Sequence, residues 1–231
     1  PTTESTTTRG YGGGLAMSFG GRADEFDLGE IRTTPIFDLK NTKAFSYTVG
    51  VKFPQNYNIL SSAGDLYPSA VILSLEFGKS ELYTQVLANL EIYYVTYFRF
   101  VGLDEKGPNL ALFNRESSDW HYFGFSFDFE SGALTWTFDD GEIYKSNIST
   151  DLDLQALDDF ILEESTVDGS VPVYLRLGSS AHSFANFQGT LDNVCVYNRA
   201  LTLEELQTNA FSDECSGTSP EEKPVLHLKF D

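Results

Sequence analysis

The sequence predicts an all-β protein: a two-sheet antiparallel sandwich of the jelly-roll type, with one short helix near its C-terminal end. The chain has 231 residues, which is enough for one large all-β domain. It is rich in aromatic residues, with 19 Phe and 12 Tyr, and these side chains suit half-buried, pleated strands. Short strand-like stretches follow one another with turn signals between them, which is typical of a sandwich.

The strands are predicted from period-two alternation and from short apolar runs bounded by turns. Alternation is clearest in residues 119–129, where the face that carries His121, Phe123 and Phe125 is expected to point into the core. Hairpins are signalled by "ESG" at 130–132 and "DDG" at 139–141. The other predicted strands cover residues 15–19, 44–53, 70–77, 81–87, 91–102, 133–138, 171–179 and 189–198, and residues 151–170 are predicted to be a short helix or a long loop.

The helix is predicted over residues 202–211, "TLEELQTNAF". Thr202 followed by Glu205 forms a capping box, in which each side chain accepts a hydrogen bond from the other residue's backbone. Leu201 and Leu206 have the spacing of a hydrophobic staple at the same end. We therefore expect the helix to begin directly after Leu201.

The chain divides into three predicted regions. Residues 1–14 are rich in Thr and Gly and are predicted to be a linker. The sandwich is predicted over residues 15–215, and residues 216–231 are predicted to hold a second linker and a terminal strand. Because the chain begins at Pro1 and not at Met, it is expected to be a mature piece or a fragment of a longer protein.

The formal net charge is -19, from 34 acidic and 15 basic residues. Nucleic acid and anionic membrane surfaces are bound by clustered Lys and Arg, so this balance disfavours both partners. It is compatible with solubility and with bound divalent cations. The sequence has no apolar run of roughly 18 residues, so we predict no membrane insertion.

The stretch from 175 to 206, "LRLGSSAHSFANFQGTLDNVCVYNRALTLEEL", resembles the closing segment of the concanavalin A-like, laminin-G-like jelly rolls. Those domains typically have a Leu-x-Ile-Gly strand, a loop, then Gly-x-Ile-Asp-Glu-Val-x-Ile-Tyr-Asn-Arg-Ala-Leu and a short helix. Residues 12–30 and 117–143 are similar to the family's opening strands and to its central Trp-His strand and hairpin. The resemblance covers about 15–211 and implies the same sandwich fold.

The family's usual first strand, Leu-Val-x-x-Leu-x-Phe-Asp, has no match before Tyr11. A matching phrase stands instead at 223–231, "KPVLHLKFD". This strand either begins a following repeat or fills the sheet position left empty at the start of the sandwich. In both cases an unpaired edge strand invites pairing with a partner, so self-association is expected to be possible.

The resemblance also implies a structural calcium ion, because related domains often hold one with the Asp of the closing strand and oxygens near the first strand. Asp192 matches the closing-strand Asp. Asp231 would match the first-strand position if the terminal strand folds back onto the sandwich. A solvated or turn-bonding aspartate is the alternative at both positions.

Glu25, Asp27 and Glu30 have the spacing of a sugar-cleaving carboxylate set, with a nucleophile, an acid and a tuning Asp. In the related sandwich-fold glucanases this motif lies on a central strand between aromatic residues. Here it follows the opening strand, between Arg22-Ala23-Asp24 and Ile31-Arg32, in a chain where chance matches are common. We therefore predict no catalytic residue, and a glycoside hydrolase that uses these three residues is an alternative function.

Cys195 and Cys215 are the only cysteines. The strand end, turn and helix between them could bring the chain back, so a disulfide is expected, with two buried thiols as the alternative. Asn147-Ile148-Ser149 is an N-glycosylation acceptor. Both features indicate an extracellular or cell-surface location.

These observations predict a non-catalytic recognition or adhesion module that belongs to a larger, repetitive surface protein. Its expected ligand is a glycan or an extracellular protein, bound with or without calcium. A sugar ring would stack on exposed aromatic side chains, for which Trp120, Trp136 and the Tyr residues in 91–102 are candidates. A purely structural repeat of an extracellular filament is a second alternative function.

Overall fold

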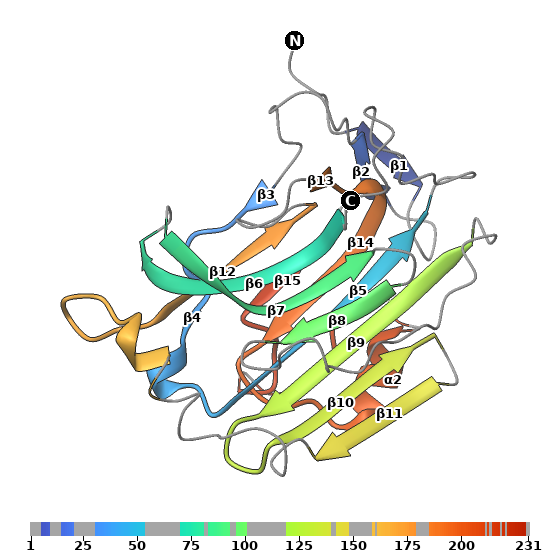
Figure 1. The fold of residues 1–231 in the computed structure, drawn as a ribbon. Coiled ribbons are helices and arrows are strands. Elements are labelled where there is room, and N and C mark those ends of the chain that lie inside the picture. The colour runs from blue at the N-terminus through green and yellow to red at the C-terminus, as the bar shows by residue number, and fades with distance from the viewer. Residues whose placement is uncertain are drawn as a thin grey trace.

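The computed structural model shows an all-β sandwich of two antiparallel sheets with the short helix α2 (Leu203–Ala210) (Figure 1). The fold class predicted from the sequence is thus confirmed. The structure describes residues 6–9, 15–20, 31–53, 70–80, 83–92, 96–100, 119–139, 142–147, 159, 161–178, 185–210, 212, 214–217, 219 and 221–229.

The larger sheet has eight strands in the order β1-β2-β14-β5-β9-β10-β11, and β15 pairs with β14 beside this path. Neighbouring strands are antiparallel throughout, as the predicted hairpins require. The bounds are β1 Thr6–Arg9, β2 Leu15–Gly20, β14 Gln188–Tyr197, β5 Ala44–Lys52, β9 Trp120–Asp128, β10 Ala133–Phe138, β11 Glu142–Asn147 and β15 Leu226–Leu228.

The second sheet has seven strands in the order β3-β12-β6-β7-β8, with β4 beside β12 and β13 beside β6. The β13–β6 pair is parallel and joins two residues of each strand, whereas its neighbours are antiparallel. The bounds are β3 Ile31–Arg32, β12 Pro172–Leu177, β6 Ala70–Ser80, β7 Tyr83–Ile92, β8 Thr96–Phe100, β4 Phe37–Asp38 and β13 Ala185–Asn186, and a 3₁₀ turn, η2 (Leu39–Asn41), follows β4.

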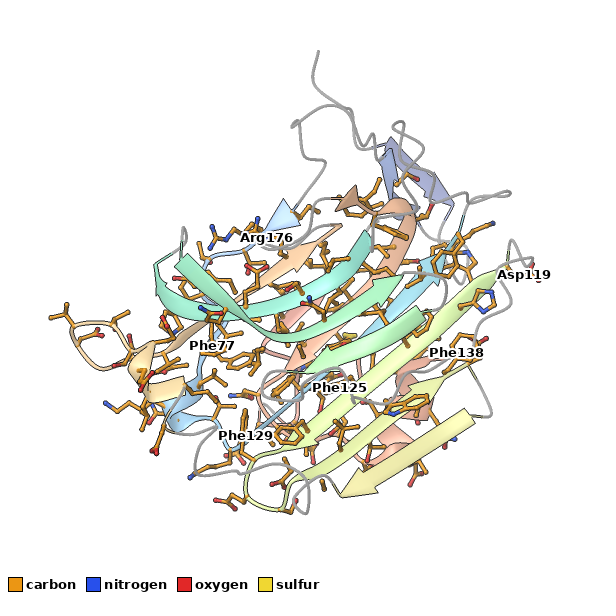
Figure 2. All side chains as sticks on the ribbon, in the orientation of Figure 1. Phe77, Asp119, Phe125, Phe129, Phe138 and Arg176 are labelled. Carbon is orange, nitrogen blue, oxygen red and sulfur yellow. A yellow bond between two sulfur atoms is a disulfide. The ribbon has the colours of Figure 1, made fainter. Side chains whose placement is uncertain are left out.

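The core lies between the two sheets and is largely aromatic. Figure 2 shows Phe77 and Phe125 in this layer, one from each sheet. The Phe125 ring stacks on Phe45 and Tyr47 of β5, with ring centroids 5.6 and 5.3 Å apart. The core-facing set that alternation predicts for β9, including Phe123 and Phe125, is therefore confirmed.

The opposite face of β9 is buried too, which alternation does not predict. Helix α2 packs on this outer face of the larger sheet, against β5, β9 and β10. Gly124 lies beneath the helix, where an added Cβ would stand 3.1 Å from Leu206 Cδ2. Tyr122 and Ser126 are covered on the same face. The helix therefore turns a half-buried strand into a fully buried one.

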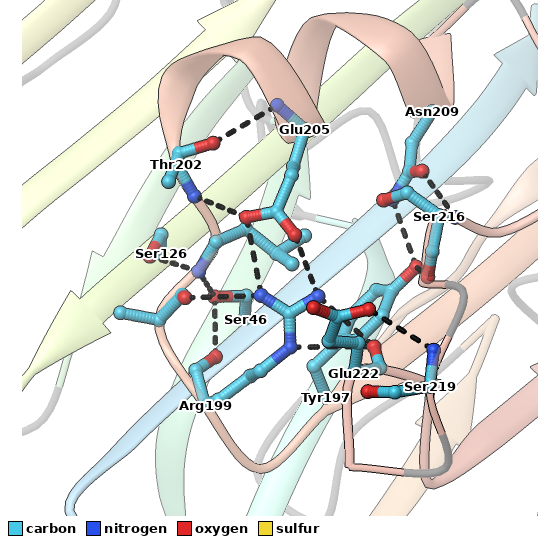
Figure 3. Close-up of polar contacts among 12 residues, drawn as sticks. Ser46, Ser126, Tyr197, Arg199, Thr202, Glu205, Asn209, Ser216, Ser219 and Glu222 are labelled. Carbon is cyan, nitrogen blue, oxygen red and sulfur yellow. Dashed lines mark hydrogen bonds and ion pairs between the residues drawn. The ribbon is translucent and has the colours of Figure 1, made fainter.

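Helix α2 begins with the predicted capping box (Figure 3). Glu205 N donates to Thr202 Oγ1 over 3.2 Å, and Thr202 N donates to Glu205 Oε2 over 2.8 Å. Arg199 binds the same carboxylate with both terminal nitrogens, Nη2 to Oε1 at 2.7 Å and Nη1 to Oε2 at 3.1 Å. Arg199 Nη2 also donates to the backbone oxygen of Glu222 over 2.9 Å. One guanidinium therefore ties the helix to the segment that leads to β15.

Candidate functional site

A row of polar side chains crosses the seven-stranded sheet at one level. Arg32 on β3 lies opposite Arg176 on β12, Arg176 lies opposite Ser74 on β6, and Ser74 lies opposite Asn89 on β7. Leu73, Leu75, Leu175 and Leu177, their neighbours in the strands, belong to the core between the sheets. Since successive side chains of a strand point to opposite faces, the row lies on the outer face. We call these four residues the arginine row.

Arg176 has a buried counter-charge in the same face. Its Nε lies 3.3 Å from Glu76 Oε1, and the side chains of Arg176 and Glu76 are 9% and 0% exposed. Ser74 Oγ donates to the same carboxylate oxygen over 3.2 Å. A buried ion pair gains little net stability, but it fixes both side chains in one geometry. The centre of the row is therefore rigid.

Arg32 stands at the more accessible end of the row. Its guanidinium carbon lies 4.9 Å from the centre of the Tyr174 ring, a cation–π contact. Arg32 is half-buried, whereas Tyr174 and Arg176 are buried. Like charges directly opposite one another in a sheet are unfavourable, and Arg32 faces Arg176 across one strand pair. Ser74 and Asn89 are buried as well, so Arg32 is the member of the row that a polar ligand would reach.

Local sequence patterns do not identify this row. Its members are single polar residues inside otherwise apolar strands, as in "SLEF" at 74–77 and "YLRL" at 174–177. Polar residues at such positions signal a special site, because a buried charge needs a partner. Which strands carry the partners depends on the pairing of distant segments, which no local pattern contains.

A second polar pair lies where β9 begins and β10 ends. His121 Nδ1 is 2.9 Å from Asp139 Oδ2, and Tyr122 N donates to Asp139 Oδ1 over 2.8 Å. The His121 ring stacks on Phe138, with centroids 5.6 Å apart. Asp139 has a φ of 47°, so it forms the left-handed corner of the turn. His121 therefore links the start of β9 to the end of β10.

Asp192 lies at a bulge of β14 and is 5% exposed. Its Oδ1 accepts a hydrogen bond from Asn193 N over 2.8 Å, and Asn193 has a φ of 47°. The Asn193 side chain donates from Nδ2 to Ser212 O over 2.6 Å, and its Oδ1 lies 2.9 Å from His227 Nε2. Asp192 therefore supports the bulge. Asp231 lies outside the described residues, and calcium binding by these two aspartates stays a prediction.

Cys195 and Cys215 form the expected disulfide, with their Cα atoms 6.0 Å apart. Cys195 points to the outer face of the larger sheet, where it packs with Tyr197, Leu201 and Leu206. The two sulfur atoms and a ring nitrogen of His227 lie within 4.8 Å of one another. Metal binding by cysteine needs thiolates, so the oxidised pair does not use this arrangement for a metal.

The remaining predicted site residues fare differently. Glu25, Asp27 and Glu30 lie outside the described residues. Asn147 is the last residue of β11, opposite Ala133. The two tryptophan candidates differ in burial. Trp120 is half-buried at the start of β9, whereas Trp136 is 2% exposed within the main core. The interpretation of Trp136 as a sugar platform is therefore wrong, because neighbouring core residues cover its ring.

The sequence was compared with protein-family models and with curated proteins. The sequence matches no family model and no curated protein. In the part of the chain that the structure describes, no helix is long and apolar enough to cross a bilayer.

Several solved structures have a similar fold. The CBM40 domain of the Ruminococcus gnavus IT-sialidase aligns with a TM-score of 0.50 at 10% identity, over 90% of this chain and 100% of that one. A Trypanosoma rangeli sialidase in complex with the inhibitor DANA aligns with a TM-score of 0.51 at 12% identity, over 86% of this chain and 27% of that one.

The full extracellular region of zebrafish Gpr126/Adgrg6 is also similar, with a TM-score of 0.47 at 12% identity. The alignment covers 86% of this chain and 25% of that region, so the chain spans only part of the longer neighbours. Identities at this level show the fold alone. The chain is a β-sandwich of the jelly-roll type.

Proposed function

We propose that the chain is a non-catalytic extracellular recognition module that binds a glycan, or a protein, at the Arg32 edge of the outer face of its seven-stranded sheet. The observation that carries the proposal is the arginine row, with the Arg32–Tyr174 contact at its accessible end. Binding sites combine a few fixed polar groups with aromatic side chains; the row supplies the polar groups, and Tyr174, 5% exposed beside Arg32, supplies a ring. The ion pair of Arg176 with Glu76 holds the centre of the row in one geometry, so few side chains need ordering when a ligand binds.

Two further observations support this function. The CBM40 domain of the Ruminococcus gnavus sialidase has a similar fold, so a sandwich of this kind is compatible with carbohydrate binding. The Cys195–Cys215 disulfide supports an extracellular or cell-surface location, because disulfides persist in oxidising compartments. The acceptor at Asn147 is consistent with the same location.

The test is a binding screen of the purified chain against a panel of neutral and acidic glycans and immobilised extracellular proteins. We expect retention of at least one ligand class, and at least about a tenfold loss of affinity in Arg32→Ala, the loss of a well-placed polar contact. Lys43→Ala is the matched control, because the Lys43 side chain is 75% exposed and directly precedes β5 of the other sheet. No retention of any ligand, or equal binding by Arg32→Ala, would overturn the proposal.

A further inference from the structure

One edge of β14 is divided between two strands that belong to opposite ends of the described chain. β2 pairs with the first half of β14, from Gly20 opposite Gln188 to Met17 opposite Leu191. β15 pairs with the second half, from Leu228 opposite Val194 to Leu226 opposite Val196. Both strands are antiparallel to β14, so they run in the same direction. β15 and β2 therefore stand end to end, separated by three steps of β14, about 10 Å.

The side chains of β15 alternate between the core and solvent. Leu226 and Leu228 are half-buried and pack against the main core, on the same face as Val194 and Val196. His227 is exposed, and Val225, just before the strand, is 37% exposed. β15 thus contributes two leucines to the core. Its backbone pairs with β14 over three residues.

The segment before β15 divides into a fixed part and a hinge. Cys215 is fixed by its disulfide to Cys195, and Ser216 N donates to Asn209 Oδ1 over 2.7 Å. Gly217 follows with a φ of 123°, where the chain turns toward β15. From Ser216 to Leu226 there are ten residue steps, which span up to roughly 35 Å when extended. The strand can therefore reach well beyond its own β14 while it remains covalently attached.

We propose that β15 is an exchangeable strand, which can leave its own β14 and pair with the same edge of β14 in a second copy of the chain. The exchanged pairing reproduces the contacts of the closed form, with Leu226 and Leu228 in the partner's core. Such exchange of an identical element is a low-cost route to association. The turn between Ser216 and Val225 opens, and with it the Arg199 contact to the Glu222 backbone and the hydrogen bonds from Glu222 N and Lys223 N to Ser219 O. This interaction is independent of the arginine row, which lies on the other sheet.

The tether determines when exchange occurs. A short linker holds β15 near its own edge at an effective concentration of about millimolar, so the closed form dominates in dilute solution. Exchange becomes competitive when a second copy is present at a similar local concentration. Because each copy both donates a strand and accepts one, two copies close into a dimer and further copies can continue as a chain.

The test uses the full chain in size-exclusion chromatography with light scattering, at about 10 μM and at about 1 mM, concentrations that lie on either side of the effective concentration. We expect a monomer at the lower concentration and a substantial dimer fraction at the higher one. Leu228→Asp places a charge where the strand meets the core and should abolish this dimer. Val225→Asp, at an exposed position of the same segment, is the matched control and should dimerise as the wild type does.

A synthetic peptide with the sequence of residues 221–229 extends the test without altering the protein. In excess, it should occupy the vacated edge and convert the wild-type dimer to monomer, whereas the same peptide with Leu228→Asp should not. The peptide arm remains decisive if the Leu228→Asp protein does not fold. The proposal is overturned if the wild type stays monomeric at about 1 mM, if a folded Leu228→Asp protein dimerises equally, or if the unmodified peptide leaves the dimer intact.

Discussion

Glu76 Oε1 lies 3.3 Å from Arg176 Nε, and this ion pair is buried on the outer face of a sheet, away from the core between the sheets. A charge at such a position is costly without its partner. Each member of the pair therefore depends on the other, and together they fix the orientation of the arginine row.

Glu76→Gln should destabilise the chain strongly, because it leaves the Arg176 guanidinium buried without a counter-charge. Breaking a buried pair costs about 3–5 kcal/mol, which urea unfolding measures directly. Glu130→Gln is the control: it removes an ion pair with Lys43 whose side chains are 69% and 75% exposed. That change should alter the free energy of unfolding by less than about 1 kcal/mol. Equal losses in the two variants would contradict this account.

Removal of the disulfide should lower stability by about 3 kcal/mol, the loop-closure value for a bridge that joins residues 20 apart in the sequence. Cys195→Ala with Cys215→Ala makes the change, and thermal or urea unfolding under non-reducing conditions measures it. Mass spectrometry should show a gain of about two daltons when the wild type is reduced, because two S–H bonds replace one S–S bond. An unchanged mass would show that the bridge is absent from the purified protein.

The stabilising effect of Glu205 should depend on pH. Burial alone would raise the pKa of this carboxyl, but hydrogen bonds from Arg199 and Thr202 outweigh burial and leave the pKa below its usual 4.5. The stabilisation is therefore fully present above pH 4.5 and is lost as the pH falls through the lowered pKa. Urea unfolding of wild type and Glu205→Gln should differ at pH 7 and converge at the acidic end. A difference that is independent of pH would rule out this linkage.

If Asp192 holds calcium as the sequence predicts, Ca²⁺ should raise the melting temperature and a chelator should lower it. Ligand binding to the folded state alone stabilises by mass action, by about 2.7 kcal/mol at a hundredfold excess over Kd. Asp192→Asn keeps an oxygen for the Asn193 N–H and removes the charge, so it should abolish the calcium response. Differential scanning calorimetry checks this, and a melting temperature insensitive to Ca²⁺ would assign Asp192 to the bulge alone.

Local patterns predicted much of the fold. The capping box of Thr202 and Glu205 depends on residues three apart, and it forms as expected. Alternation in β9 identified its core-facing aromatic residues correctly. It could not show that α2 covers the other face, because that cover comes from a helix about eighty residues later in the chain. The prediction of an exposed Trp136 is wrong for a related reason, since a side chain's exposure depends on what packs over it.

The sequence by itself determined the class of the molecule: strands from period-two alternation, one helix from its caps, and the candidate disulfide from its two cysteines. The tertiary structure alone decided which strands are neighbours. Register between distant strands brings Arg32 opposite Arg176 and places Leu228 opposite Val194. Periodicity is a local property of the backbone, whereas pairing depends on the burial of whole faces against each other. The arginine row and the β15–β14 edge both depend on this pairing of distant strands.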